Sequence, residues 1–396
     1  MGKRRLVHGA SRLVLDATTR LTDVVEAMHH NIVRGPLPAS TAHARSHGRT
    51  AGLTGFVYGA IRSVARLAGT ALDAVTDTMP RDHAVAPPSR DIFVAALNGV
   101  VGDHLAATGN PLAIPMRLRL DGRALELTPE ALAAAYPAAT SKVVVLLHGS
   151  CSSDRLWLRR GHDHGQALAR DLGFTPVYLH YNSGLHIHDN GTLFAPLLRE
   201  LVAAWPVPID ELVSLCHSMG GLVVRSALHL DPTLPIDRVI FCGTPHHGSP
   251  LERAGNILDT VLGNTHYTGP LSRLGKLRSA GITDLRHGTI DALAKGDRFA
   301  PKSDVRPPVP LPEGIACYAI AASLTARPSA LGDGLVLVDS ALGHHRRPEL
   351  ELGLPAERCF VAAGIGHMDL LGDPEVYAQI ATWLSQDGIT PSSRPG

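Results

Sequence analysis

The chain has 396 residues, which is enough for one large domain and an appendage. Hydrophobic residues make up 44% and charged residues 18%, so a large core is available and a wholly disordered chain is excluded. The net charge of only +1 gives no support for nucleic-acid binding.

The N-terminal part of the chain is basic. Residues 1–80 hold ten Lys/Arg and five Asp/Glu, a net charge of +5, whereas the remainder is mildly acidic. Apolar residues recur every three or four positions over 10–30 and again over 51–78, which predicts two amphipathic helices joined by a linker at 31–50. We expect neither a signal peptide nor a membrane span, because charged residues interrupt both candidate segments.

Two roles are open for this helical extension at 1–90. It could be a helical hairpin that packs on the body of the protein. Alternatively, arginines flanking an apolar stripe could bring it to an anionic membrane surface through residues 1–80. We expect a cytoplasmic protein, because the cysteines indicate reduced thiols, with peripheral membrane contact as the alternative.

From residue 91 onward, strands and helices alternate. A helix is expected near 91–107, followed by a hairpin in which Asp121-Gly122 joins two short apolar runs at 114–120 and 123–127. Apolar runs typical of buried parallel strands then follow at Val143–Leu147, Pro176–Tyr181, Leu212–Cys216, Arg238–Cys242, Cys317–Ala322 and Cys359–Ala363. This order predicts an α/β domain at 91–396 with a doubly wound, mostly parallel sheet. The long stretch at about 248–312 is expected to form a lid-like insertion.

The strongest motif for chemistry is Cys216-His217-Ser218-Met219-Gly220-Gly221, which follows an expected strand and precedes a helix expected at 221–230. A nucleophile elbow needs such a turn with small flanking residues, and Gly220 is one of them. A serine hydroxyl also needs a neighbouring base, and His367 follows the last expected strand, where the base belongs. The alternatives are a simple helix N-cap for Ser218 and an exposed loop histidine for His367.

The remaining groups of the expected site come from two other strand ends. The acid should follow the penultimate strand, where Asp333 and Asp339 both stand; Asp333, between two glycines, is favoured to orient His367. Asp339 is expected instead to cap the next element. The backbone N–H groups of Ser150, in the His-Gly-Ser turn after 143–147, and of Met219 are the expected oxyanion donors.

We expect no cofactor and no metal ion. His162-Asp163-His164 and His186-Ile187-His188-Asp189 lack partners at metal-type spacing, so polar loops are favoured there. The five cysteines lack C-x-x-C pairs and mostly lie in apolar runs, which predicts reduced, buried thiols.

Several segments together carry a family resemblance. They are Leu147-His148-Gly149, His217-Ser218-Met219-Gly220-Gly221, Gly243-Thr244-Pro245-His246-His247-Gly248, Gly332-Asp333-Gly334 and Gly366-His367. Through them residues 141–386 resemble bacterial α/β-hydrolases of the lipase and esterase type, related to triacylglycerol lipases and GPI-inositol-deacylase-like proteins. Cys216 departs from the usual elbow glycine, and the first 90 residues lie outside the resemblance.

The resemblance implies an α/β-hydrolase fold and the hydrolysis of carboxyl esters, of a small molecule or a lipid, through an acyl-enzyme on Ser218. A thioesterase, amidase or lactonase with the same three side chains is the first alternative. A non-catalytic lipid-binding scaffold is the second.

Overall fold

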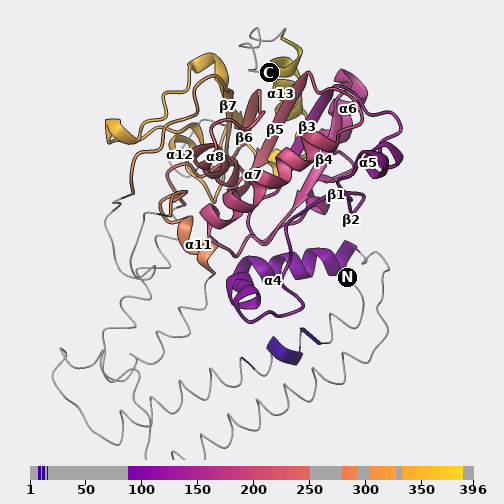
Figure 1. Cartoon of the computed structure of the whole chain (residues 1–396). Coiled ribbons are helices and arrows are strands. Elements are labelled where there is room, and N and C mark those ends of the chain that lie inside the picture. The colour runs from indigo at the N-terminus through magenta and orange to yellow at the C-terminus, as the bar shows by residue number, and fades with distance from the viewer. Residues whose placement is uncertain are drawn as a thin grey trace, which may run out of the picture.

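The centre of the computed structural model is an eight-stranded sheet with the strand order β2-β1-β4-β3-β5-β6-β7-β8 (Figure 1). The structure describes residues 8–9, 11–13, 16, 88–249, 279–292, 304, 306–326 and 332–386. The strands are β1 (Arg117–Leu120), β2 (Arg123–Ala124), β3 (Lys142–Leu147), β4 (Thr175–His180), β5 (Glu211–His217), β6 (Arg238–Cys242), β7 (Ala316–Ser323) and β8 (Cys359–Ala363). The β1–β2 hairpin joins β4 in antiparallel fashion, and every pairing from β4 to β8 is parallel.

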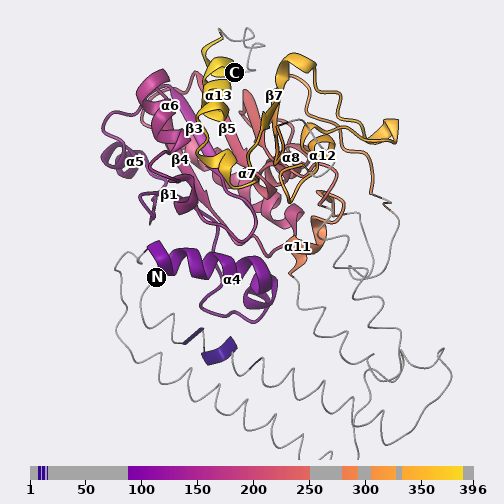
Figure 2. The ribbon, with the colours of Figure 1, turned by 180° about the vertical axis from the view of Figure 1, so that it is seen from behind.

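Helices cover both faces of the sheet. The α-helices are α4 (Pro88–Ala107), α5 (Pro129–Ala135), α6 (His164–Leu172), α7 (Ile187–Ala204), α8 (Met219–Leu230), α11 (Ala280–Asp284), α12 (Val338–Leu342) and α13 (Pro374–Ser385). Short 3-10 turns lie at Asp154–Trp157, Pro348–Leu350, Ala356–Arg358 and Asp369–Leu371. Figure 1 shows α7 and α8 in front of the sheet, and the reverse view in Figure 2 brings α6 and α13 to the front.

This layering follows from strands that are apolar on both sides. On β3, Val143, Val145 and Leu147 belong to the core cluster under α7 and α8, whereas Val144 and Leu146 belong to the cluster under α6 and α13. A strand covered on both faces needs apolar residues at every position rather than alternate ones. The continuous apolar runs in the sequence therefore predicted central parallel strands correctly.

Helix α4 lies across the end of the sheet where the parallel strands finish. A Cβ added to Gly99 would lie 2.3 Å from Cys151 Sγ, and one added to Gly102 would lie 1.9 Å from Asn182 Oδ1. Cys151 and Asn182 belong to the loops that follow β3 and β4, so α4 packs directly on these loops. Both glycines are required for that close approach.

The strand order and the crossovers define an α/β-hydrolase fold, as the sequence predicted. The limits of β6 and β8 agree with the prediction, but the expected 114–120 and 123–127 pair shortens to β1 and β2. The helix expected near 91–107 begins earlier, at Pro88, and the one expected at 221–230 begins at Met219. The predicted linker at 31–50 and helix at 51–78 lie outside the described residues, as do most of the 10–30 helix and of the 248–312 insertion.

All five cysteines are free, which confirms the predicted unpaired thiols. Cys216, Cys242 and Cys317 are buried, whereas Cys151 and Cys359 are partly exposed, so the prediction of burial holds for three of them. Burial raises the pKa of the Cys242 thiol to about 12. Among the helices that the structure describes, none is long and apolar enough to cross a membrane.

Candidate active site

Ser218 lies in a sharp turn between β5 and α8. Its backbone has φ 54° and ψ −124°, a conformation that side-chain-bearing residues rarely adopt. The Ser218 N–H donates to the Cys242 carbonyl at 2.9 Å, which ties the turn to the end of β6. A Cβ on Gly220 would lie 2.6 Å from the Leu147 carbonyl oxygen, so the first turn of α8 packs closely on β3 only because residue 220 is glycine.

His367 and Asp333 form a buried pair. His367 Nδ1 lies 2.7 Å from Asp333 Oδ2, and the two side chains are only 6% and 1% exposed. Because a carboxylate can only accept, Nδ1 carries a proton, so in the neutral ring Nε2 is the acceptor. The His367 N–H also donates to the Asp333 carbonyl at 3.2 Å, so both the main chain and the ring of His367 are held by this aspartate.

The imidazole of His367 packs on the same strand end that holds Ser218. A Cβ added to Gly243 would lie 3.1 Å from His367 Cε1, and Gly243 directly follows Cys242. Ser218, Asp333 and His367 thus follow β5, β7 and β8, at the edge of the sheet where the parallel strands end. The other candidate acid, Asp339, is exposed in the first turn of α12. Its expected role as a cap is wrong, because Leu337 is the N-cap residue of that helix.

His217, which precedes the nucleophile candidate, has a role that the sequence did not reveal. Its Nε2 lies 3.1 Å from the His367 carbonyl oxygen, and the two imidazole rings are 4.7 Å apart. Burial holds the pKa of His217 well below its usual range, so Nε2 donates as part of a neutral ring. His217 therefore supports the His367 loop, and only its position next to Ser218 could have drawn attention to it.

The loop after β3 borders Ser218 directly. A Cβ on Gly149 would lie only 2.9 Å from the Ser218 Cβ, so the loop backbone passes over the serine. Within the described part of the chain, neither the Ser150 N–H nor the Met219 N–H has a protein acceptor. Of these two N–H groups, one lies on the loop that borders Ser218 and the other at the start of α8.

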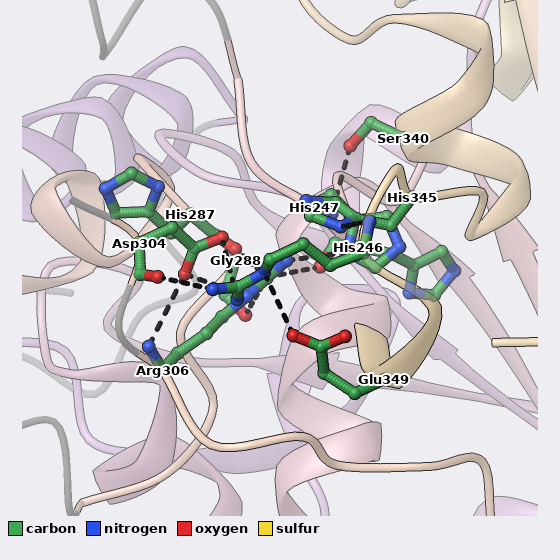
Figure 3. Close-up of polar contacts among 10 residues, drawn as sticks. His246, His247, His287, Gly288, Asp304, Arg306, Ser340, His345 and Glu349 are labelled. Atoms are coloured by element: carbon green, nitrogen blue, oxygen red, sulfur yellow. Dashed lines mark hydrogen bonds and ion pairs between the residues drawn. The ribbon is translucent and has the colours of Figure 1, made fainter. Parts of the chain in front are cut away.

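A cluster of histidines around Arg306 braces the segment after β6 (Figure 3). Arg306 Nη1 donates to the His246 carbonyl at 2.9 Å and to the His287 carbonyl, while Nη2 donates to His247 Nδ1 at 2.7 Å. His247 Nε2 lies 2.9 Å from the Gly343 carbonyl. Burial lowers the pKa of His247 to about 4, so it accepts from Arg306 as a neutral ring. The cluster ties the loop after β6 to the segments around 287, 306 and 343.

The two histidine-rich motifs are engaged in protein contacts. His164 bridges His162, at 2.8 Å, and the Leu370 carbonyl, at 2.9 Å. His186 lies 3.0 Å from Asp284, which connects the start of α7 to α11. Over the residues that the structure describes, no group of three or more His, Cys, Asp or Glu side chains is arranged to hold a metal ion.

Comparison with known proteins finds only distant structural similarities. No protein-family model matches the sequence, and a search of the curated proteins finds no match. Among solved structures, the mature form of a Bacillus licheniformis lipase is 20% identical, with 61% of this chain and 90% of that chain covered and a TM-score of 0.41. An esterase from Rhodococcus sp. is 18% identical over 63% of this chain and 93% of that one, with a TM-score of 0.36. An α/β-hydrolase fold protein from Burkholderia ambifaria is 14% identical over 62% and 90%, with a TM-score of 0.37.

Proposed function

We propose that this protein is a serine hydrolase that cleaves carboxyl esters. Ser218 is the nucleophile, His367 the general base, Asp333 the acid that orients it, and the Ser150 and Met219 amides the oxyanion donors. The observation that carries the proposal is the buried 2.7 Å contact between His367 and Asp333, next to a serine in a strained strand-to-helix turn.

The mechanism uses only groups of this chain. His367 Nε2 takes the Ser218 hydroxyl proton as the oxygen attacks the ester carbonyl, and the two amides stabilise the negative oxygen that forms. The C–O bond to the alcohol then breaks, and His367 returns the proton to the leaving alcohol. Water, deprotonated by His367, attacks the acyl-enzyme, and the bond from the acyl carbon to Ser218 Oγ breaks as His367 returns the proton to that oxygen, which releases the acid and restores Ser218.

Two exposed leucines favour an ester with apolar groups. Leu324 is 51% exposed and Leu335 is 40% exposed. A Cβ on Gly366 would lie 3.5 Å from a Leu324 methyl, so this side chain borders the residue before His367. Leu335 donates its N–H to Asp333 Oδ1 at 2.9 Å. Each methylene of an acyl chain that such a rim buries contributes about 0.8 kcal/mol of binding free energy, so kcat/KM should rise with chain length until the apolar surface is covered.

The proposal is tested with p-nitrophenyl esters of increasing chain length and with a fluorophosphonate probe. Ser218→Ala should lower kcat by on the order of 10⁴-fold or more while the thermal unfolding curve stays that of a folded protein. Ser385→Ala is the matched control, since Ser385 is an exposed residue at the end of α13. The probe should label Ser218 alone; labelling of another serine, or an active Ser218→Ala protein, would disprove the assignment. Thioester and amide substrates in the same assay decide between the ester and its closest alternatives.

A further inference from the structure

We propose that His148 is a positioning residue that aims the Ser150 N–H at the reacting carbonyl oxygen. The inference rests on the proposed function. His148 ends the run that leads from β3 into the loop over Ser218, and it is 2% exposed. Its imidazole contacts the Gly149 carbonyl, which belongs to the same peptide group as the Ser150 N–H, the proposed donor.

The hydrogen bonds of His148 fix one tautomer. Nδ1 lies 2.8 Å from the Gly149 carbonyl oxygen, which can only accept, so Nδ1 carries the proton. Nε2 must then be an acceptor, and the Tyr181 N–H donates to it at 3.4 Å. Both contacts require the same neutral ring with its proton on Nδ1.

The contact with Gly149 determines where Ser150 N–H points. In a planar trans peptide, the carbonyl of one residue and the N–H of the next are directed oppositely. The bond from His148 holds the Gly149 carbonyl against the ring, so the Ser150 N–H faces away from the ring. In the described part of the chain this N–H has no protein acceptor, as an oxyanion donor requires.

Tyr181 holds the His148 ring and main chain in place. The two rings are stacked with centroids 4.3 Å apart and planes 16° apart. Tyr181 Oη donates to the His148 carbonyl at 2.8 Å. A Cβ on Gly220 would lie 2.8 Å from that carbonyl oxygen. The His148 carbonyl therefore also packs on the first turn of α8, beside Met219. The two proposed donors are thereby fixed relative to each other before substrate arrives.

The neutral state of His148 is maintained by its surroundings. Burial and the neighbouring His180 and Arg119 lower the pKa of His148 to about 3, against the opposing effects of the Gly149 hydrogen bond and Asp154. A protonated ring would present an N–H to the Tyr181 N–H and break the arrangement.

The test is a set of three variants in the full chain. His148→Phe keeps an aromatic ring for the stack but removes the donor to Gly149. His148→Asn restores a donor, because its amide nitrogen takes the place of Nδ1. Tyr181→Phe keeps the stack and removes only the hydroxyl that holds the His148 carbonyl. Each is measured for kcat, KM and inhibition by a trifluoromethyl ketone, whose oxyanion adduct needs the same donors.

His148→Phe should lower kcat between about 10-fold and the 10³-fold that loss of an entire oxyanion donor costs. Its KM should stay within about two-fold, and the ketone should bind more weakly by a factor similar to the loss in kcat. His148→Asn should recover most of both losses, and Tyr181→Phe should show a smaller loss of the same kind.

Two outcomes would overturn the inference. The first is a fully active His148→Phe protein. The second is a set of variants that have a lower melting temperature or a higher KM but bind the ketone as the wild type does. If wild-type protein neither hydrolyses esters nor reacts with fluorophosphonate at Ser218, the proposed function falls and this inference with it. An active Ser218 enzyme that ignores changes at His148 and Tyr181 contradicts this inference alone.

Discussion

The two oxygens of the Asp333 carboxylate have separate partners. Oδ2 accepts from His367, whereas Oδ1 accepts the N–H groups of Leu335 at 2.9 Å and Val336 at 2.7 Å. The main-chain contacts fix the carboxylate in one orientation, so Oδ2 remains aimed at the imidazole. A charged acceptor held by two amides is the arrangement that best keeps one tautomer of a histidine.

Asp333→Asn is expected to reverse that tautomer. The amide oxygen must keep the place of Oδ1 to accept from Leu335 and Val336, which leaves the NH₂ group facing His367 Nδ1. The imidazole proton then moves to Nε2, where it blocks the base, and kcat should fall by roughly 10⁴-fold. Asp339→Asn, on the exposed face of α12, should leave the kcat for p-nitrophenyl butyrate close to wild type. Equal losses in the two variants would contradict the choice of Asp333.

The sequence could predict these residues because each has a local signal. Ser218, Asp333 and His367 each follow an apolar run that reads as a strand, and parallel strands deliver such residues to one edge of a sheet. No such signal marks Tyr181 or His217, because their partners His148 and His367 are 33 and 150 residues away in the chain. Contacts of that range follow from the assembled sheet and from no pattern within a segment.

At the scale of elements, the junction of β3, β5 and α8 determines the site. Helix α8 begins at Met219, immediately after Ser218, and its first turn packs on the Leu147 and His148 carbonyls. The sequence predicted a start two residues later, at Gly221, and the two glycines at 220 and 221 have a low helix propensity. Close packing on β3 outweighs that propensity, which explains the difference.

Gly220→Ala separates these two effects. Helix propensity alone would make the variant more stable by up to about 1 kcal/mol. The added methyl, however, would lie 2.6 Å from the Leu147 oxygen and 2.8 Å from the His148 oxygen, both main-chain atoms that cannot rotate away. We expect a lower melting temperature and reduced ester turnover, because α8 must move and carry Ser218 with it. A variant that melts at or above the wild-type temperature would show that the elbow is looser than its contacts indicate.

At the scale of the whole molecule, the few described residues between 8 and 16 contact α4 and the loop after it. Asn110 Nδ2 donates to the Gly9 carbonyl at 3.1 Å, and His104 lies 3.1 Å from Asp16. Leu13 packs on the small apolar cluster of Val94, Ala95, Leu105, Leu112 and Ile114, formed by α4 and the loop after it. Amphipathic periodicity predicted a helix over 10–30, of which the structure describes only residues 11–13 and 16. It did not predict their partner, since an apolar stripe does not specify the surface that it covers.

Gly9→Val tests which role these residues have without altering the charge of residues 1–80. A Cβ on Gly9 would lie 2.2 Å from the Leu112 side chain and 2.7 Å from Asn110 Oδ1, so the substitution should force residues 8–16 away from the loop after α4. Overpacking of this kind costs about 1–3 kcal/mol.

If the segment serves to cover α4, the melting temperature should fall, and hydrolysis of a soluble short ester and of a vesicle-borne ester should fall in the same ratio. We expect this result, because the described contacts of Gly9, Leu13 and Asp16 are with α4 and the loop after it. If instead the basic arm brings the enzyme to an anionic surface, Gly9→Val should leave vesicle hydrolysis intact. High salt should then reduce vesicle hydrolysis selectively in the wild-type protein, since exposed charges are screened beyond about 8 Å at physiological ionic strength. Co-sedimentation with anionic vesicles, run on both proteins at low and high salt, decides between the two roles.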